Sequence, residues 1–157
     1  MIVGIVSDTH DYVTRIRDAV EAFAGLSANA IIHAGDIVSP FALNELLKAN
    51  IPVHIVFGNN DGDRNHLSSI FPAIQTPPMK LELGGRRFLV THESHKVTDD
   101  DLENADVFVF GHTHKYLCEP GPPLTINPGE ACGWITGSPT AAVLDTETLK
   151  VTKIALD

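Results

Sequence analysis

Seven side chains of metal-ligand type fall at the ends of apolar runs in this sequence. The clearest case is residues 107–114, "VFVFGHTH", where two histidines separated by one threonine follow an apolar run and Gly111. Histidine is costly to bury without a partner, so two of them at the end of a buried strand indicate a metal ion. Similar polar ends follow four other predicted strands, and the seven candidate ligands are Asp8, His10, Asp36, Asn59, His92, His112 and His114.

Each of these motifs has an ordinary structural interpretation when taken alone. An aspartate after a strand often caps a helix, and Gly-Asp and Gly-Asn-Asn-Asp are common turn sequences. His33 and His54 lie within apolar strands, which fits buried structural groups better than ligands. The joint occurrence favours a metal site, because the carboxyl ends of neighbouring strands in an α/β sheet converge.

The number of candidate ligands indicates two ions. Four imidazoles, two carboxylates and one amide exceed the four ligands that a single structural zinc takes. If one carboxylate bridges, each of two ions receives four protein ligands. Nitrogen and oxygen ligands without a thiolate indicate manganese, iron, zinc or nickel rather than a soft metal. Two ions about 3.5 to 4 Å apart form a clamp suited to displacement at phosphorus.

The first half of the chain has the pattern of parallel strands with crossover helices. Helical spacing of apolar residues covers residues 12–24, a second helix begins at Pro40, and a short helix is expected near 63–70. These helices alternate with apolar, β-branched runs at residues 1–6, 30–34 and 52–57. The order β-α-β-α-β predicts a parallel sheet.

The second half is predicted to be mostly antiparallel strand. A hairpin joins residues 79–83 and 86–91 through Gly84-Gly85. Further strands are expected at residues 107–110, 124–127, 141–145 and 149–155. Two packed sheets with helices outside would bury both kinds of strand, and residues 1–157 are expected to form a single domain.

Composition excludes several classes of partner. The chain has 157 residues, of which 43% are hydrophobic and 20% charged, as in an ordinary globular protein. A formal net charge of −9 argues against general binding to nucleic acid or anionic membranes. No apolar run approaches the roughly 20 residues of a membrane span, and residues 1–10 do not resemble a signal peptide. We therefore expect a cytoplasmic protein, with Cys118 and Cys132 as reduced thiols.

The order of five motifs resembles the calcineurin-like metallophosphoesterases. The motifs are "DTH", "GD", "GNND", "TH" and "GHTH", and the resemblance is strongest to the small prokaryotic YfcE-type phosphodiesterases, which "HAGD" and "INPGE" also resemble. The resemblance spans essentially the whole chain. It implies a four-layer α/β/β/α sandwich of two mixed sheets flanked by helices, with two divalent metal ions at the strand ends.

The resemblance also implies a role for each ligand. Asp8, His10 and His114 would bind the first ion, Asn59, His92 and His112 the second, and Asp36 would bridge them. A hydroxide held between the ions would attack a small or nucleotide-like phosphodiester. Manganese is the expected metal, with nickel, zinc, iron or magnesium as alternatives, and the family suggests a homo-oligomer, either a dimer or a tetramer.

Three positions depart from the family pattern. Asn60 replaces a histidine that would protonate the leaving group, so it is expected to donate a hydrogen bond to phosphate instead. Ser39 replaces an aspartate that follows the Gly-Asp motif. The fourth motif reads "HES" rather than "HGH", and His95 follows one place later as another candidate proton donor.

Two alternative functions stay open at this point. A retromer-type subunit resembles the same family and uses the fold as a protein-interaction scaffold with an impaired metal centre. The seven complete ligand positions favour an enzyme over that scaffold. A phosphomonoesterase is the other alternative, because substrate specificity depends on loops around residues such as His66 and Lys115.

Overall fold

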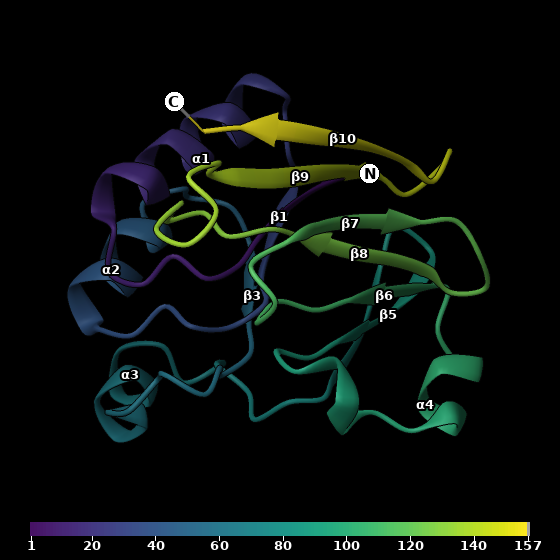
Figure 1. Cartoon of the computed structure of the whole chain (residues 1–157), viewed down its shortest axis with the longest axis horizontal. Coiled ribbons are helices and arrows are strands. Elements are labelled where there is room, and N and C mark those ends of the chain that lie inside the picture. The colour runs from purple at the N-terminus through teal and green to yellow at the C-terminus, as the bar shows by residue number, and fades with distance from the viewer. Residues whose placement is uncertain (157) are drawn as a thin grey trace.

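Two five-stranded sheets pack face to face, and helices cover their outer sides (Figure 1). The computed structural model describes residues 1–156. In the first sheet the strand order is β10-β9-β1-β2-β3. Its strands are β1 (Ile2–Val6), β2 (Ala30–His33), β3 (Val53–Ile55), β9 (Thr140–Asp145) and β10 (Lys150–Ala155). Strands β1, β2 and β3 are parallel, as the alternating pattern predicts, whereas β9 pairs antiparallel with β1.

The second sheet has the order β4-β5-β6-β8-β7. Its strands are β4 (Met79–Leu83), β5 (Arg86–Val90), β6 (Val107–Val109), β7 (Tyr116–Glu119) and β8 (Leu124–Pro128). The expected hairpin of β4 and β5 is present. The expectation of a mostly antiparallel second half is wrong for the centre of this sheet, because β5, β6 and β8 are parallel. The segment containing η1 (Ser94–Lys96) and α4 (Asp99–Glu103) carries the chain from β5 to β6, so these two strands point the same way.

Three hydrophobic clusters separate four layers. One lies between the first sheet and helices α1 (Val13–Gly25), α2 (Pro40–Leu47) and α3 (Arg64–Ile70), with Phe23 and Leu43 among its buried residues. A second joins the inner faces of the two sheets, for example Ile5 and Phe88. The third covers the outer face of the second sheet, where Leu102 packs near Phe108. Figure 1 shows α1, α2 and α3 on one side of the molecule and α4 (Asp99–Glu103) on the other. The predicted α/β/β/α sandwich is therefore confirmed.

Three further elements lie outside the expected set. Strand β7 follows the last histidine motif and pairs with β8. The acidic stretch before β6 forms the short helix α4, because Thr98 and Asp101 form a reciprocal capping box at its N-terminus. A single 3-10 turn, η1 (Ser94–Lys96), precedes it. Within residues 1–156, no helix has both the length and the apolar character needed to cross a membrane.

Candidate metal centre

The seven candidate ligands lie in loops that follow β1, β2, β3, β5 and β6, at the carboxyl ends of these strands. Backbone hydrogen bonds tie the loops together: the amide of Asp8 donates to the carbonyl of Gly35 (3.1 Å), and that of Gly111 donates to His92 (3.0 Å). The amide of His112 donates to Asp8 Oδ2 at 3.1 Å, which links the second sheet to the first. The centre therefore lies where the two sheets meet.

The first group contains Asp8, His10 and His114. Asp8 Oδ1 lies 3.3 Å from His114 Nε2 and 3.8 Å from His10 Nε2. His10 Nε2 is also 3.6 Å from Asp36 Oδ2. Asp8 is fully buried, and the His10 and His114 side chains are only 15% and 13% exposed. These four atoms therefore lie close together among largely buried side chains.

The second group contains Asn59, His92 and His112. Asn59 Oδ1 lies 3.0 Å from His92 Nε2 and 2.9 Å from His112 Nδ1. His92 Nε2 is 3.2 Å from Asp36 Oδ2, so the same carboxylate oxygen adjoins both groups. Asn59 and His112 are exposed, whereas Asp36 and His92 are buried. The second group is therefore the part of the centre that is more open to solvent.

The spacing within both groups fits metal ligands. Two atoms that each lie about 2.0 to 2.2 Å from one ion are roughly 2.8 to 3.6 Å apart. The separations of 2.9 to 3.8 Å lie in or just beyond this range. Asp8 Oδ1 and His10 Nε2 are also buried without a hydrogen-bond partner, which is costly unless a cation satisfies them. The residues therefore fit a divalent metal centre.

Electrostatics in the centre also favour a cation. Burial raises the pKa of Asp8, although the neighbouring His92 partly opposes this effect. Burial alone would raise the pKa of Asp36 too, but hydrogen bonds from His92 and Asn60 lower it below its ordinary value. The centre thus holds two buried carboxylates close together, and bound cations would relieve their desolvation and mutual repulsion.

Neighbouring groups fix the orientation of two ligand histidines. His92 Nδ1 donates to the carbonyl oxygen of Ala34 (2.8 Å), and His114 Nδ1 donates to Glu130 Oε2 (2.7 Å). With a metal ion bound in place of a proton, both residues would present the lone pair of Nε2 to the centre. Such outer hydrogen bonds typically set the tautomer and basicity of metal-binding histidines.

The backbone of the ligand loops is unusual. Five of the seven candidate ligands have positive φ, a conformation that costs energy for residues other than glycine. Their φ values are 52° for Asp8, 41° for His10, 61° for Asp36, 66° for His112 and 60° for His114. Such strained residues persist only where the surrounding structure holds them, and they concentrate at functional sites.

Small residues let these loops approach one another. A Cβ atom on Gly58 would collide with the carboxylate of Asp36, and one on Gly111 would collide with Ser7 Oγ. Asp61, which the sequence analysis left without a role, accepts hydrogen bonds from the amides of Asp36 (3.1 Å) and Gly58 (2.7 Å). It therefore holds two ligand loops in register.

His33 is a structural histidine, as expected from its place within an apolar strand. It is fully buried; its Nδ1 accepts from the amide of Gly35 (3.2 Å), and its Nε2 lies 3.0 Å from Thr9 Oγ1. Burial lowers the pKa of His33 to about 3, so its ring is neutral. Through these contacts it links the loop that carries Asp8 to the loop that carries Asp36.

The two candidate catalytic residues outside the ligand set lie in different surroundings. Asn60 adjoins the centre, where its Nδ2 donates to Asp36 Oδ2 at 2.7 Å and its backbone amide donates to Asp36 Oδ1 at 2.8 Å. A phosphate oxygen would have to share or replace the first of these bonds. The His95 side chain is 70% exposed and lies 3.9 Å from Glu93. Within residues 1–156 it has no hydrogen bond or ion pair with a candidate ligand.

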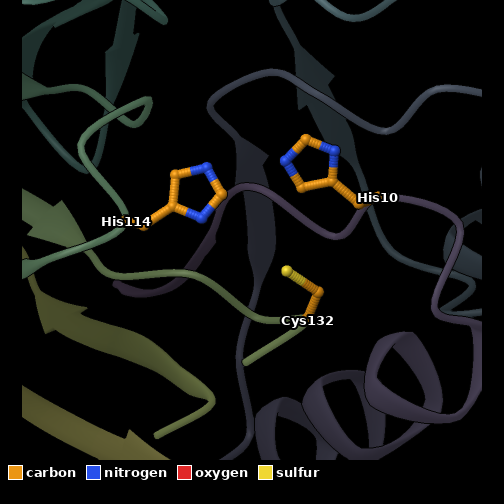
Figure 2. Close-up of side chains that lie close together, drawn as sticks. All are labelled: His10, His114 and Cys132. Atoms are coloured by element: carbon orange, nitrogen blue, oxygen red, sulfur yellow. The ribbon is translucent and has the colours of Figure 1, made fainter. Parts of the chain in front are cut away.

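Glu130 and Cys132 are neighbours of the centre that sequence reasoning missed. Glu130 is fully buried, and its carboxylate also accepts from Thr136 Oγ1 (2.7 Å) and the amide of Ile135 (3.0 Å). Figure 2 shows the Cys132 sulfur close to the rings of His10 and His114. The ring nitrogens and the sulfur that could bind a metal ion lie within 4.8 Å of one another. Burial raises the pKa of Cys132 to about 12, so it stays a thiol, and it donates to Glu130 Oε2 (3.4 Å).

Replacing Glu130 by glutamine is expected to weaken binding of one metal ion about 10- to 100-fold, the usual effect of losing an outer hydrogen-bond partner. The glutamine NH₂ group would face donors that now point at a carboxylate. Calorimetric titration of the metal-free protein with Mn²⁺ measures this affinity, with Glu103→Gln, an exposed site, as control. Unchanged affinity at both sites would mean that Glu130 supports only the 131–139 loop.

The sequence of the chain was compared with known protein families and with individual proteins. The profile of the calcineurin-like phosphoesterase superfamily domain matches residues 1–149. The phosphodiesterase MJ0936 of Methanocaldococcus jannaschii is 37% identical over the full length of both chains. The phosphodiesterase YfcE of Escherichia coli is 27% identical over 92% of this chain and 88% of its own.

Solved structures agree with the sequence comparison. The structure of an archaeal phosphodiesterase superposes with a TM-score of 0.89 at 37% identity, covering 99% of this chain and 100% of that one. Vps29 of Chaetomium thermophilum has a TM-score of 0.68 at 16% identity over 99% and 95% of the two chains. The second likeness shows only the shared fold.

Proposed function

The chain belongs to the calcineurin-like phosphoesterase superfamily, and we propose that it is a phosphodiesterase that works with two divalent ions, manganese being the first candidate. Asp8, His10 and His114 would hold one ion, and Asn59, His92 and His112 the other. The observation that carries this assignment is the position of Asp36, whose Oδ2 lies 3.6 Å from His10 Nε2 and 3.2 Å from His92 Nε2. A carboxylate between two sets of nitrogen and oxygen ligands is suited to bridge two ions.

The bound ions would supply acidity to a water molecule and would neutralise charge on the phosphate oxygens. The protein's own residues prepare the site for this chemistry. Ala34 and Glu130 fix the rings of His92 and His114, as described above, and Asp61 holds the loops of Asp36 and Gly58. Preorganised ligands need little rearrangement during the reaction, which is a main source of catalytic power.

The substrate is proposed to be a small phosphodiester. The second ligand group opens to solvent at Asn59 and His112, so the phosphate can reach the centre from outside. The net charge of −9 disfavours long nucleic acids, whose many phosphates require a basic surface. A cytoplasmic location and a dimeric or tetrameric assembly stay predictions from the sequence.

The scaffold alternative receives no separate support from the geometry. A protein that used this fold only for protein contacts would tolerate loss of ligands. Here all seven ligand positions carry competent side chains, and they lie together with donor separations that suit metal binding. A preference for monoesters over diesters would depend on the loops that surround the metal centre. An assay with both kinds of substrate distinguishes the two.

The purified chain, stripped of metal, is expected to hydrolyse bis(p-nitrophenyl) phosphate only after a divalent ion is added. Mn²⁺, Ni²⁺, Zn²⁺ and Mg²⁺ should be compared, with EDTA as the control and p-nitrophenyl phosphate as the monoester. Metal analysis should approach two ions per chain, because the ligands form two groups. Hydrolysis that persists in excess EDTA, or saturation at one ion, would contradict the two-ion proposal. Faster monoester cleavage would reverse the proposed substrate class.

A further inference from the structure

An exposed aromatic residue stands beside the metal centre. Trp134 and Ile135 are 64% and 73% exposed, the highest values among the large hydrophobic side chains of residues 1–156. They lie in the 131–139 loop between β8 and β9, directly after the buried residues Ala131 and Cys132. Leaving a large apolar side chain in water is unfavourable, and an indole ring next to a reaction centre is suited to bind a ligand.

The tryptophan ring continues a row of aromatic rings that begins inside the centre. The imidazoles of His114 and His10, visible in Figure 2, stack with centroids 5.3 Å apart and an angle of 22°. The His10 ring then stacks with Trp134 at 6.0 Å and 27°. The ring of Tyr12 also lies beside Trp134, with centroids 6.0 Å apart and an interplanar angle of 32°. A group attached to a phosphate at the centre could therefore reach Trp134, because the indole lies directly beside the ring of His10.

The loop that carries Trp134 is held firmly at both ends. The amides of Ala131 and Cys132 donate to the carbonyls of Ser7 (3.0 Å) and Asp8 (3.1 Å), which lie in the first ligand loop. On the far side, the amide of Ile135 donates to Glu130 Oε1 (3.0 Å). The backbone that carries the indole is therefore held relative to the metal ligands, and a ligand that stacks on the ring need not order the loop first.

We propose that Trp134, with Tyr12 beside it, is a stacking subsite for a planar aromatic group, such as a nucleobase, attached to the phosphate of the substrate. This inference rests on the proposed function, because the metal centre is what anchors the phosphate. Base-on-aromatic stacking tolerates every base, since each has a π face. The enzyme would then prefer nucleotide-like phosphodiesters without selecting one base.

A protein partner is a weaker explanation for the same exposed ring. A stable interface needs about 800 Å² from each partner, contributed by roughly 20 to 30 residues. Trp134 and Ile135 are two side chains on one short loop, and the nearest ring neighbours, His10 and Tyr12, are partly buried. Their position beside the metal ligands fits a substrate subsite better than a broad contact surface.

Two product-like probes test the subsite without relying on turnover. Adenosine 5′-monophosphate and ribose 5-phosphate carry the same phosphate on the same sugar, but only the first has a base. On the Mn²⁺-loaded protein, we expect the nucleotide to bind about 5- to 150-fold more tightly, the range that one stacked base contributes. Trp134 is the only tryptophan in the chain, so the nucleotide should also quench its fluorescence, whereas the sugar phosphate should not.

Substitutions identify the ring that is responsible. Trp134→Ala should bring the two dissociation constants, measured by calorimetry, to within about twofold of each other, and Trp134→Phe should keep most of the difference. The Trp134 side chain is exposed, so neither substitution should affect the fold. Leu26→Ala, which removes an apolar side chain that is 46% exposed at the far end of α1, is the matched control and should change nothing.

The outcomes separate this inference from the proposed function. If diesters are hydrolysed with metal but both probes bind equally and fluorescence is unchanged, the subsite is wrong and the function stands. If no diester is hydrolysed and neither probe binds, the proposed function fails and the subsite fails with it. If Trp134→Ala instead converts an oligomer to monomers in sedimentation experiments and leaves the probe ratio intact, the ring is an interface residue and the proposal is overturned.

Discussion

Asp36→Asn is expected to lower kcat/KM for a phosphodiester by at least about 10³-fold, since even the loss of an outer partner of a metal ligand costs about 10- to 100-fold. The carboxylate oxygen of Asp36 adjoins both ligand groups, so its loss weakens both ion sites at once. Asparagine keeps the shape of the side chain and tolerates the left-handed backbone that Asp36 adopts, with φ of 61°. Asp36→Ala should abolish activity as well, with added strain at this position.

The measurement is kcat/KM with saturating Mn²⁺, together with metal analysis of the same samples. The variant should hold fewer than two ions per chain. Asn59→Ala should lose less activity, because in the proposed assignment Asn59 would serve one ion only. Asp99→Asn, an exposed carboxylate in α4, is the control and should behave as the wild type. Wild-type activity in Asp36→Asn, with two ions bound, would show that Asp36 does not bridge.

The second large effect concerns the leaving group. Proton donation by a general acid typically raises the rate about 10²- to 10⁴-fold, so cleavage of an alkyl diester without such an acid should be slower by that factor. The resemblance of the motifs implies that Asn60 stands where related enzymes carry the acid, and an amide cannot release a proton at neutral pH. The Nδ2 of Asn60 moreover donates a hydrogen bond to Asp36 Oδ2 at 2.7 Å. The rate should therefore fall steeply as the pKa of the leaving group rises.

A series of diesters with graded leaving-group pKa measures this dependence under conditions where chemistry limits the rate. Aryl groups could also stack on Trp134, so the series should be repeated in Trp134→Ala, where only the chemical effect remains. Asn60→His should recover part of the alkyl ester cleavage, and Asn60→Ala should not. A flat dependence in the wild type would point to another donor. If His95→Gln then made it steep, exposed His95 would be that donor.

The sequence predicts that the candidate ligands lie close together, because each of them is marked locally. Asp8, Asp36 and His112 each follow a short apolar run and a small residue, and the carboxyl ends of strands in one sheet must meet. The parallel strands of the first sheet follow from the alternation of strand and helix. The same reasoning failed for the parallel pairing of β5, β6 and β8. The helix between β5 and β6, α4, is too short to give a helical pattern, and β7, which lies between β6 and β8 in the chain, was not expected.

The surroundings of the centre could not be predicted in the same way. Glu130 reaches His114 only because the chain after β8 returns beside the loop of β1, where Ala131 bonds to Ser7. No periodic pattern in residues 129–139 indicates that contact, and the motif that contains Glu130 was noticed only as a resemblance. Trp134 likewise looks like an ordinary loop residue until the ring of His10 is placed beside it. Long-range contacts of this kind depend on the whole topology.

The order of the ligands along the chain also bears on how the protein is made. Asp8 and His112, which bond directly across the two sheets, are 104 residues apart. At about 5 to 20 residues per second, a ribosome needs roughly 5 to 20 s to pass from one to the other. The first carboxylates therefore emerge in a nascent chain that still lacks the histidines of the last motif. The full set of candidate ligands can therefore be assembled only after translation of that motif, and a chain stalled before it would hold the first parallel strands without a complete centre.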